Sequence, residues 1–575
     1  MIVRMPPGSH RTICGLLASR AEKFPDRPYV RFQIGGVETA ALTYADTWSY
    51  STRWAALLRD RGLRKGGPVL LALPNTVDFV GAFFGALLAG GLPATVAPMR
   101  RRPSGDPHVS NILSRLRFLR AGVLVLPKEQ AQDPDFPSTG LPDGVAVVSS
   151  QDLPPEPEPL SPCDRETDLA LLQFTSGTLG SAKAVELTHA ALLAQLDSVS
   201  RALALDGAMD SAVSWLPFSH DMGLIGFLLT PAFVGGHVTL LQAEEFVVRP
   251  ALWIRALSDS GATITGGPPS AYLLCARRIK QTEACRYDLS RLRVGLVGAE
   301  MVSRRSLRLF EKRFAAAGLR PTALTPTYGL AETCLAVTMA PLERGPEVES
   351  VDLQTLQEEG RAVRPKLDEG LRREFVSVGV PLWNTEIVIV DDDGKPLPER
   401  QMGEITVRSP SLMSGYRGDP LSTRQALSNG RLFTGDLGFQ ANGSLFITGR
   451  KKEILVVGGR NYYPEDLENE AATVPGVRRW KVVAVSYDDP DLATEEVVLM
   501  VETGVTDGGE RQLLRRAIRR ALIHADYPVS QVVLVPPKTF RTTPSGKLMR
   551  LDARRRFLAG DFGQPARRPE SPGLG

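Results

Sequence analysis

Residues 168–203 read DLALLQFTSGTLGSAKAVELTHAALLAQLDSVSRAL, and this stretch decides the fold class. It begins with an apolar run of strand character at 168–174, continues through a Ser/Gly-rich loop, and becomes a helical run after Thr188. A buried strand that leads through such a loop toward an amphipathic helix is typical of a helix-covered parallel sheet. The stretch therefore predicts an α/β fold.

The same alternation extends to both sides of this stretch. Further strand-like runs lie at 68–73, 122–126, 211–217 and 237–241. The segment 74–98 holds an apolar run long enough to suggest a membrane span. However, Asn75 and Asp78 open this run, and the break from Gly90 to Pro93 interrupts it. We therefore expect a buried helix followed by a buried strand, not a membrane protein.

The character of the sequence changes twice toward the C-terminus. After about residue 375, short β-rich runs separated by DDG and ERQMG turns suggest a small β-subdomain. A charged GRKKE run at 449–453 then precedes a self-contained pattern of helices and strands. The expected organisation is a large N-terminal domain at 1–449 with the β-subdomain at about 375–449, a hinge at 450–453, a small mobile α+β C-terminal domain at 454–560, and a disordered tail at 561–575.

Composition excludes several classes of protein. Hydrophobic residues make up 43% of the 575 positions and charged residues 23%, which excludes a disordered or fibrous chain. The net charge of +4 gives no reason to expect nucleic acid as a partner. Five cysteines without a CxxC spacing indicate neither a disulfide framework nor a zinc cluster. The N-terminus lacks an apolar signal core, so we expect a cytoplasmic location.

The loop FTSGTLGSAK at 174–183 is the sharpest chemical feature. Its hydroxyls, backbone N–H groups and lysine can bind a polyphosphate, although the spacing of a Walker A loop is missing. A Ser/Gly-rich β-turn without a ligand is the alternative for this loop taken alone. The candidate phosphate-binding residues are Thr175, Ser176, Gly177, Thr178, Gly180 and Lys183.

Two further loops suggest a nucleotide site. TYGLAE at 327–332 places Tyr328, whose ring can stack on a purine, near Glu332, which can hold a divalent ion bridging phosphates. FTGDLG at 433–438 supplies Asp436 on a turn, where it can accept hydrogen bonds from ribose hydroxyls. The structural alternatives are a helix-starting glutamate and an aspartate in an Asx-turn with Gly438.

Seven motifs in this order resemble the adenylate-forming superfamily of acyl-CoA ligases, peptide-synthetase adenylation domains, luciferases and fatty acyl-AMP ligases. The resemblance covers about residues 10–560, and its specificity lies in the order, because each motif alone is weak. The motifs are FTSGTLGSAK, WLPFSHDMGL, GAE, TYGLAE, GDLG, GRKKE and PSGK.

Within the superfamily, the chain is most similar to the fatty acyl-AMP ligases. WLPFSHDMGLIG at 215–226 and GGRNYYPEDLE resemble that family's versions of these motifs, and Ala331 stands where CoA ligases usually have threonine. The long segment between Glu332 and Gly379 contains VDLQTLQEEGRAV, which is similar to that family's insertion. The resemblance implies that this insertion restricts the domain movement needed for CoA transfer and that the acyl group goes to an acyl carrier protein.

The resemblance also implies a role for each matching residue. Lys547 would bridge the carboxylate and the α-phosphate, Glu332 would hold Mg²⁺, and His220 would approach the acyl carboxylate together with Asp221. Lys452 would be the hinge residue. The nucleotide ATP would contact Gly298, Ala299, Glu300, Thr327, Tyr328, Gly329, Asp436 and Arg450, and its leaving pyrophosphate would contact the loop from Thr175 to Lys183. For His220 and Lys452, a core histidine and a surface lysine remain the alternatives.

The sequence departs from the superfamily in the phosphate loop. Ala184 replaces the usual glycine, Leu179 replaces a common serine or threonine, and Lys183 is present although many acyl-AMP ligases lack it. These changes leave adenylation as the expected reaction. The implied function is ATP-dependent conversion of a fatty or related acid to acyl-AMP, followed by transfer to a carrier protein in natural-product assembly. The rivals are an acyl-CoA ligase and a nucleotide-binding pseudoenzyme or scaffold.

The roles of two apolar runs and of one arginine-rich helix remain open at this stage. The runs 224–236 and 263–274 are small and apolar, so they either wall an alkyl tunnel or belong to the core. The helix QLLRRAIRRAL presents an apolar face opposite four arginines. Those arginines, Arg515, Arg516, Arg519 and Arg520, are either a solvated face or a docking surface for an acidic carrier protein.

Overall fold

The computed structural model describes residues 11–99, 107–133, 136, 140–156, 165–175, 183–365, 372–451, 453, 455–457, 460–478, 481–489, 494–525, 527–542 and 548–562. Part of the predicted site lies outside the described residues, as does most of the tail predicted at 561–575. The site residues concerned are Ser176, Gly177, Thr178, Gly180, Lys452 and Lys547.

The described N-terminal part contains a nine-stranded sheet that is parallel over its central strands. Its order is β17-β14-β13-β12-β11-β9-β10-β1-β2. The strands are β1 (Pro28–Ile34), β2 (Val37–Thr43), β9 (Ser211–Ser214), β10 (His237–Leu241), β11 (Ile264–Gly267), β12 (Val294–Val297), β13 (Leu324–Tyr328), β14 (Thr338–Met339) and β17 (Val380–Pro381).

A second, seven-stranded sheet among the described residues has the order β20-β8-β7-β4-β3-β5-β6. Strands β3 to β7 pair in parallel, and β8 returns antiparallel to β7 across the predicted phosphate loop. The strands are β3 (Pro68–Leu71), β4 (Leu92–Thr95), β5 (Val123–Val125), β6 (Ala146–Val148), β7 (Leu169–Phe174), β8 (Ala184–Thr188) and β20 (Gly415–Tyr416).

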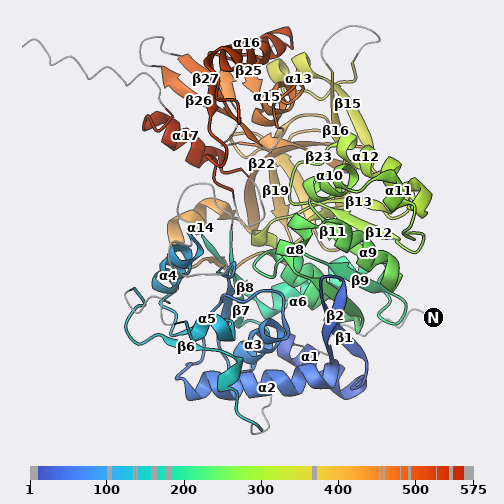
Figure 1. Ribbon diagram of the computed structural model, residues 1–575, viewed down its shortest axis with the longest axis vertical. Helices are drawn as coiled ribbons and strands as arrows, with labels where there is room; N and C mark the ends of the chain where they lie inside the picture. The colour runs from blue at the N-terminus through green and yellow to red at the C-terminus, as the bar shows by residue number, and fades with distance from the viewer. Residues whose placement is uncertain are drawn as a thin grey trace, which may run out of the picture.

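Helices fill the space between the two sheets and cover their other faces (Figure 1). The largest buried cluster joins α3, α6 and the π-helix η2 to residues of both sheets. The N-terminal helices are α1 (Ile13–Lys23), α2 (Tyr44–Asp60), α3 (Val77–Leu88), α4 (Pro107–Leu119), α5 (Lys128–Ala131), η1 (Ser150–Asp152), α6 (His189–Ala202), η2 (Met222–Leu229), α7 (Thr230–Val234), α8 (Ala243–Val248), α9 (Ala251–Ser260), α10 (Pro269–Arg278), α11 (Gln281–Ala284), α12 (Arg304–Phe314), η3 (Ala315–Ala317), η4 (Pro321–Ala323) and η5 (Ala331–Thr333).

The apolar run at 74–98 forms a buried helix and a buried strand, as predicted. Thr76 caps α3 by accepting a hydrogen bond from the backbone N–H of Phe79. Two glycines let α3 approach α2 closely, since a Cβ on Gly85 would lie 2.4 Å from the Cβ of Trp54 and one on Gly81 would lie 2.5 Å from its ring. The run is apolar because protein covers it on all sides. Over the described residues, no helix combines the length and apolar character that crossing a bilayer requires.

A five-stranded antiparallel sheet follows in the described chain, with order β18-β19-β22-β21 and β23 paired to β22. A hairpin of β15 (Val348–Asp352) and β16 (Arg372–Val376) packs against it, together with α13 (Leu353–Glu359), through a small apolar cluster. This hairpin carries the insertion-like segment. The remaining elements are β18 (Glu386–Val390), β19 (Gly403–Arg408), α14 (Pro420–Ala426), β21 (Leu427–Ser428), β22 (Arg431–Ala441) and β23 (Ser444–Arg450).

The C-terminal elements gather at the opposite end of the molecule from α1 and α2 (Figure 1). In the described part, a three-stranded sheet β26-β27-β28 is covered by α15 and α16 on one face and by α17 on the other. The elements are β24 (Leu455–Val457), β25 (Arg460–Tyr462), α15 (Pro464–Ala471), β26 (Val482–Asp489), β27 (Thr494–Glu502), α16 (Gly508–His524), β28 (Gln531–Val535) and α17 (Arg550–Leu558). The large N-terminal and small C-terminal α/β parts confirm the predicted fold class.

The structure differs from the sequence prediction in three places. Asp436 lies inside β22 and not on a turn, beside an irregularity in the β19–β22 pairing where Gly435 has φ +71°. The short hairpin of β24 and β25 and the helix α17 were not predicted. Three-residue strands carry too little pattern to be recognised, and the highly charged sequence of α17 hides the few residues that it buries.

Candidate active site

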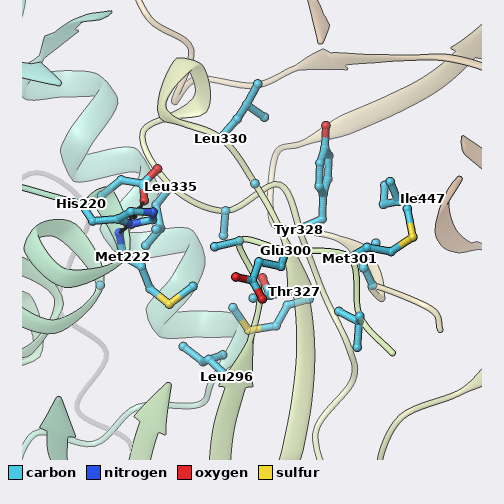
Figure 2. Close-up of a pocket in the computed structure, with 18 of the residues that line it drawn as sticks. His220, Met222, Leu296, Glu300, Met301, Thr327, Tyr328, Leu330, Leu335 and Ile447 are labelled. Atoms are coloured by element: carbon cyan, nitrogen blue, oxygen red, sulfur yellow. Dashed lines mark hydrogen bonds and ion pairs between the residues drawn. The ribbon is translucent and has the colours of Figure 1, made fainter. Parts of the chain in front are cut away.

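A cavity of about 790 Å³ lies where the carboxyl ends of β12 and β13 meet β22, β23 and the C-terminal part of the chain. Ligands of open α/β sheets bind at this end of parallel strands. Figure 2 shows His220 and Met222 on one side of the cavity and Tyr328 and Met301 on the other, with Glu300 between them. The cavity therefore joins residues from six of the seven predicted motifs.

Three predicted nucleotide residues form one hydrogen-bonded group. The Tyr328 hydroxyl donates to Oδ2 of Asp436 at 2.7 Å, and Nε of Arg450 donates to Oδ1 at 2.9 Å. Asp436 and Arg450 are register partners on β22 and β23, which explains how residues from two motifs meet. The charge of Asp436 raises the pKa of Arg450, while burial and that same carboxylate raise the pKa of Tyr328. The tyrosine ring is thus held in a fixed orientation beside the Asp436–Arg450 pair.

The GAE segment after β12 is shaped by close backbone contacts. A Cβ on Gly298 would lie 2.8 Å from Cγ2 of Thr327, so only glycine lets β12 and β13 approach this closely. Ala299 has φ +68°, a conformation that is uncommon for a residue with a side chain and that clusters at functional sites. Glu300 accepts hydrogen bonds from the backbone N–H and hydroxyl of Ser270. Its carboxylate therefore anchors the segment to α10.

The TYGLAE segment turns sharply at Gly329. A Cβ on Gly329 would lie 1.7 Å from the carbonyl oxygen of Leu335, so no other residue fits. The Thr327 hydroxyl donates to the Thr338 carbonyl at 2.7 Å, which ties β13 to β14. Thr327 and Gly329 therefore shape the cavity wall.

Glu332 is linked to the phosphate loop through a tyrosine. The Tyr416 hydroxyl donates to Oε1 of Glu332 at 2.8 Å, and the Lys183 ammonium lies 4.3 Å from the centre of the Tyr416 ring. Burial raises the pKa of the Glu332 carboxyl, and the Tyr416 hydrogen bond offsets part of that effect. The loop closes between β7 and β8, where the Thr175 N–H donates to the Lys183 carbonyl at 3.0 Å.

The residues around Glu332 fit a divalent cation that is shared with a nucleotide. A carboxylate whose ionisation is opposed by burial gains from a nearby positive charge. Among the described residues, no cluster of three His, Cys, Asp or Glu forms a complete protein site. Mg²⁺ usually takes one or two carboxylates together with substrate phosphates, which agrees with a single glutamate beside a phosphate-loop lysine.

His220 lines the cavity from the loop between β9 and η2. Its Nδ1 lies 2.6 Å from Oδ1 of Asp221, which also accepts a hydrogen bond from the Met222 N–H at 2.7 Å. Asp221 thereby orients the imidazole and begins the π-helix. His220 therefore faces a ligand-sized space and is not a histidine enclosed in the core.

The C-terminal part of the chain borders the mouth of the cavity. Arg550, the first residue of α17, binds Glu453 at 3.0 Å, Glu465 at 2.9 Å and Glu468 at 2.8 Å. Arg550 and Leu548 both line the cavity. Lys547 lies outside the described residues, but it directly precedes Leu548 in the sequence.

The insertion-like hairpin contacts the C-terminal part directly. Arg373 of β16 forms an ion pair with Asp466 of α15 at 2.6 Å, and its guanidinium lies 4.5 Å from the centre of the Tyr463 ring. Both charged side chains are almost covered, at 12% and 10% exposure. Burial raises the pKa of Asp466 to about 6, an effect that Arg373 opposes.

Several residues of this site were not predicted from the sequence. Tyr416, Arg373 and the acidic partners of Arg550 act through contacts between segments that are far apart in the chain. Only Tyr416 left a signal, the SGYRGDP run at 414–420, which is a turn-rich segment with one aromatic residue. That pattern occurs in many loops and does not indicate a role.

The comparisons with known proteins agree with this geometry. The family described as AMP-binding enzyme matches residues 17–417. A Caulobacter vibrioides protein provisionally named an acyl-CoA synthetase is 34% identical over 544 residues, 92% of this chain and 93% of that protein. The long-chain-fatty-acid–AMP ligase FadD32 of Mycolicibacterium smegmatis is 30% identical over 626 residues, 97% of this chain and 96% of that protein.

A solved structure from a study of fatty acyl-adenylate ligases of E. coli and L. pneumophila has a TM-score of 0.84 at 30% identity, covering 95% of this chain and 97% of that one. The likeness thus includes both the N-terminal and the C-terminal parts. With the family match over residues 17–417 and relatives similar along nearly its whole length, this chain belongs to the AMP-binding family of adenylate-forming enzymes.

Proposed function

We propose that this chain uses ATP to activate a fatty or related carboxylic acid as acyl-AMP and then passes the acyl group to the phosphopantetheine thiol of an acyl carrier protein. The observation that carries the proposal is the shared cavity. It places the Tyr328–Asp436–Arg450 group, Glu332 and His220 around one space that continues into an apolar branch. An adenylating enzyme needs its nucleotide site, its metal site and its acyl site to lie next to one another.

The reaction follows from the charges that must be brought together. A carboxylate oxygen attacks the α-phosphorus of ATP, the new P–O bond forms, and the bond to the bridging oxygen breaks to release pyrophosphate. The residues need only align the two anions and neutralise charge along this line. In our proposal Tyr328 stacks on adenine, Asp436 and Arg450 bind the ribose, and Lys547 bridges the carboxylate and the α-phosphate.

The leaving pyrophosphate is assigned to the loop between β7 and β8. Tyr416 contacts both the Lys183 ammonium and the Glu332 carboxylate. The proposed phosphate-binding cation and the proposed metal ligand therefore lie on either side of this tyrosine. Mg²⁺ bound there would neutralise phosphate charge. Glu332 would hold it, and Tyr416 would keep Glu332 in place.

The insertion-like hairpin supports an acyl carrier protein, and not CoA, as the acceptor of the acyl group. Its Arg373 holds Asp466 of the C-terminal part, which opposes the rotation that CoA ligases need between their two half-reactions. Lys452 is proposed as the hinge of this rotation. On α16, Arg515, Arg516, Arg519 and Arg520 are exposed while Ile518 and Leu522 are buried, so the helix presents a positive surface to an acidic carrier protein.

A product assay tests this function. The full chain is incubated with ATP, Mg²⁺ and a panel of fatty acids, with and without CoA, and the products are read by mass spectrometry. Acyl-AMP that accumulates and does not react with CoA is the expected result, and Lys547→Ala is expected to lower its formation by about 10²- to 10³-fold. Acyl-CoA as the main product would assign the chain to the acyl-CoA ligases, and the absence of any adenylate would favour a nucleotide-binding scaffold.

A further inference from the structure

The cavity continues away from the nucleotide residues as an apolar branch along η2 and α7. Met222, Gly226, Thr230 and Val234 line this branch, and their spacing of four places them on one helix face. Figure 2 shows Met222 between His220 and Leu296, and all three line the cavity. The other walls come from α6, β9 and β11, with lining residues Val199, Leu203, Ala212 and Ile264. Gly226, Thr230, Val234 and Ile264 belong to the runs 224–236 and 263–274, which the sequence left undecided between tunnel and core.

A short loop lines the cavity where it reaches the end of α7. This floor loop, residues 203–210, leaves the end of α6 through Ala204, which has φ +46°. Leu203, Leu205 and Asp210 of the loop line the cavity. At Gly207 the loop packs tightly against the end of α7, where a Cβ would lie 2.1 Å from the Val234 carbonyl oxygen. The floor loop and the last residue of α7 therefore meet across the branch.

One arginine holds both ends of the floor loop. Arg293, which precedes β12, donates through Nε to Oδ1 of Asp210 at 2.8 Å and through Nη2 to Oδ2 at 2.5 Å. Its Nη1 donates to the Leu203 carbonyl at 2.8 Å. The guanidinium thus connects the first and last residues of the loop by a bidentate ion pair and a backbone hydrogen bond.

The Arg293–Asp210 ion pair is partly buried, and both oxygens of the Asp210 carboxylate accept hydrogen bonds. The Asp210 side chain is 9% exposed, and it also accepts from the Thr263 hydroxyl at 2.8 Å and the Asp206 N–H at 2.9 Å. Burial opposes the ionisation of Asp210, but the hydrogen bonds from Arg293, Asp206 and Thr263 leave its pKa below the ordinary value. The Asp210 carboxylate therefore stays charged, and the loop stays fixed to β12.

The depth of the branch follows from the helix that lines it. Met222 and Val234 are twelve residues apart, which corresponds to about 15–18 Å at the rise of helical residues. An extended alkyl chain advances by about 1.3 Å per carbon, given a C–C bond of about 1.5 Å. A chain that starts at His220 and stops at the floor loop therefore has about 12–14 carbons.

We propose that the floor loop sets the maximum chain length of the acid and that Arg293 is the residue that positions it. This inference rests on the proposed function, because it identifies the apolar branch with the acyl group. It predicts a medium-chain fatty acid of up to about 12–14 carbons as the preferred substrate class.

Binding measurements test the inference without depending on the reaction. Dissociation constants of saturated fatty acids from 6 to 20 carbons are measured on the full chain by calorimetry, without ATP and below the concentrations at which the acids form micelles. Each buried methylene is worth about a fourfold gain in affinity. We expect the affinity to rise with chain length up to about 12–14 carbons and not beyond. When ATP and Mg²⁺ are added, the acyl-AMP yield is expected to show the same limit.

Three variants locate the limit. Arg293→Met releases the floor loop, so the affinity is expected to keep rising about fourfold per methylene beyond 14 carbons. Leu205→Trp fills the end of the branch, so the affinity is expected to stop rising at a chain length several carbons shorter. Gly226→Leu adds a side chain that fills space in the branch beside Leu335, and is expected to weaken binding of all long acids. Arg255→Met is the control, because it breaks an exposed Arg–Asp pair elsewhere.

The outcomes separate this inference from the proposed function. A shift of the length limit upward in Arg293→Met and downward in Leu205→Trp supports the inference, whereas an unchanged limit in Leu205→Trp refutes it even if Arg293→Met does not fold. Affinities that keep rising to 20 carbons in the wild type also refute it. Absence of acyl-AMP with a clear binding limit would instead refute the proposed reaction and leave the floor loop confirmed.

Discussion

At the scale of single residues, the site is built from side chains that hold one another before a substrate arrives. Asp436 is the clearest case, since both of its carboxylate oxygens are occupied, one by Tyr328 and the other by Arg450. Such pre-organisation lowers the cost of ordering the residues when the nucleotide binds. Glu332 is held in the same way by Tyr416.

The Tyr328–Asp436 hydrogen bond gives a residue-scale prediction. Tyr328→Phe keeps the ring for adenine but loses a hydrogen bond to a charged group, which is worth about 1.5–3 kcal/mol. We expect the KM for ATP in pyrophosphate exchange to rise by about tenfold or more with little change in kcat. Tyr287→Phe is the matched control, because it removes a tyrosine–carboxylate hydrogen bond at the surface. Equal KM values in wild type and Tyr328→Phe would contradict the assigned orientation.

Glu332 gives a prediction on pH and metal. Burial raises the pKa of its carboxyl, so a larger share is protonated at a mildly acidic pH than for an exposed glutamate. Because only the carboxylate binds Mg²⁺, the free Mg²⁺ needed for half-maximal activity is expected to rise as the pH falls from 8 to 5.5. The titration is carried out at fixed concentrations of the Mg²⁺–ATP complex. Glu332→Gln should lose this dependence together with most activity, and a Mg²⁺ requirement independent of pH would remove Glu332 as the metal ligand.

At the scale of elements, glycines and one unusual alanine determine how closely β12, β13 and the following loops approach. Gly298 permits the contact with Thr327, and Gly329 permits the turn that leads from Tyr328 to Glu332. The positive φ of Ala299 stores strain between them. These backbone positions fix where Tyr328 and Glu332 point.

Gly329→Ala is expected to displace the loop between Tyr328 and Glu332. The added methyl would lie 1.7 Å from the Leu335 carbonyl, and the backbone must shift to relieve this overlap. Overpacking of this kind costs about 1–3 kcal/mol, so we expect a lower melting temperature and at least a tenfold loss of acyl-AMP formation. Gly504→Ala is the control, since nothing lies within 4 Å of its Cβ position. Unchanged activity in Gly329→Ala would show that the loop adapts.

At the scale of the whole molecule, an ion pair and a tyrosine connect the described N-terminal and C-terminal parts. Arg373 and Asp466 form an almost covered ion pair between the insertion hairpin and α15. The Tyr463 hydroxyl also donates to the sulfur of Met402 at 2.9 Å. A buried charge that loses its partner is strongly destabilising, so this pair favours the observed arrangement of the two parts.

Arg373→Ala is expected to free the C-terminal part. Hydrogen exchange in α15 should become faster, and acyl-CoA formation should rise above the wild-type level. Arg364→Ala is the matched control, because Arg364 pairs with Glu349 inside the insertion region. Exchange rates in α15 equal to those of the wild type would contradict the role of this ion pair.

The same pair predicts a dependence on pH. Since the pKa of Asp466 is raised to about 6, the carboxyl of the folded protein is neutral below that value and ionised above it. The ion pair is therefore lost as the pH falls through 6. After correction for the intrinsic exchange rate, wild-type α15 is expected to approach the mobility of Arg373→Ala at pH 5, while the variant changes little.

The sequence by itself determined the α/β class, the buried nature of α3 and the motifs that supply Tyr328, Glu332 and Asp436. These features depend on periodicity and on residues that are neighbours in the chain, which a sequence displays directly. Only the tertiary structure decided that Asp436 lies in a strand, that Tyr416 holds Glu332, that Arg373 meets Asp466 and that Arg293 fixes the floor loop. The contacts Tyr416–Glu332, Arg373–Asp466 and Arg293–Asp210 each join residues 80 or more positions apart. Packing brings such segments together, and no local pattern records which distant charge a side chain will meet.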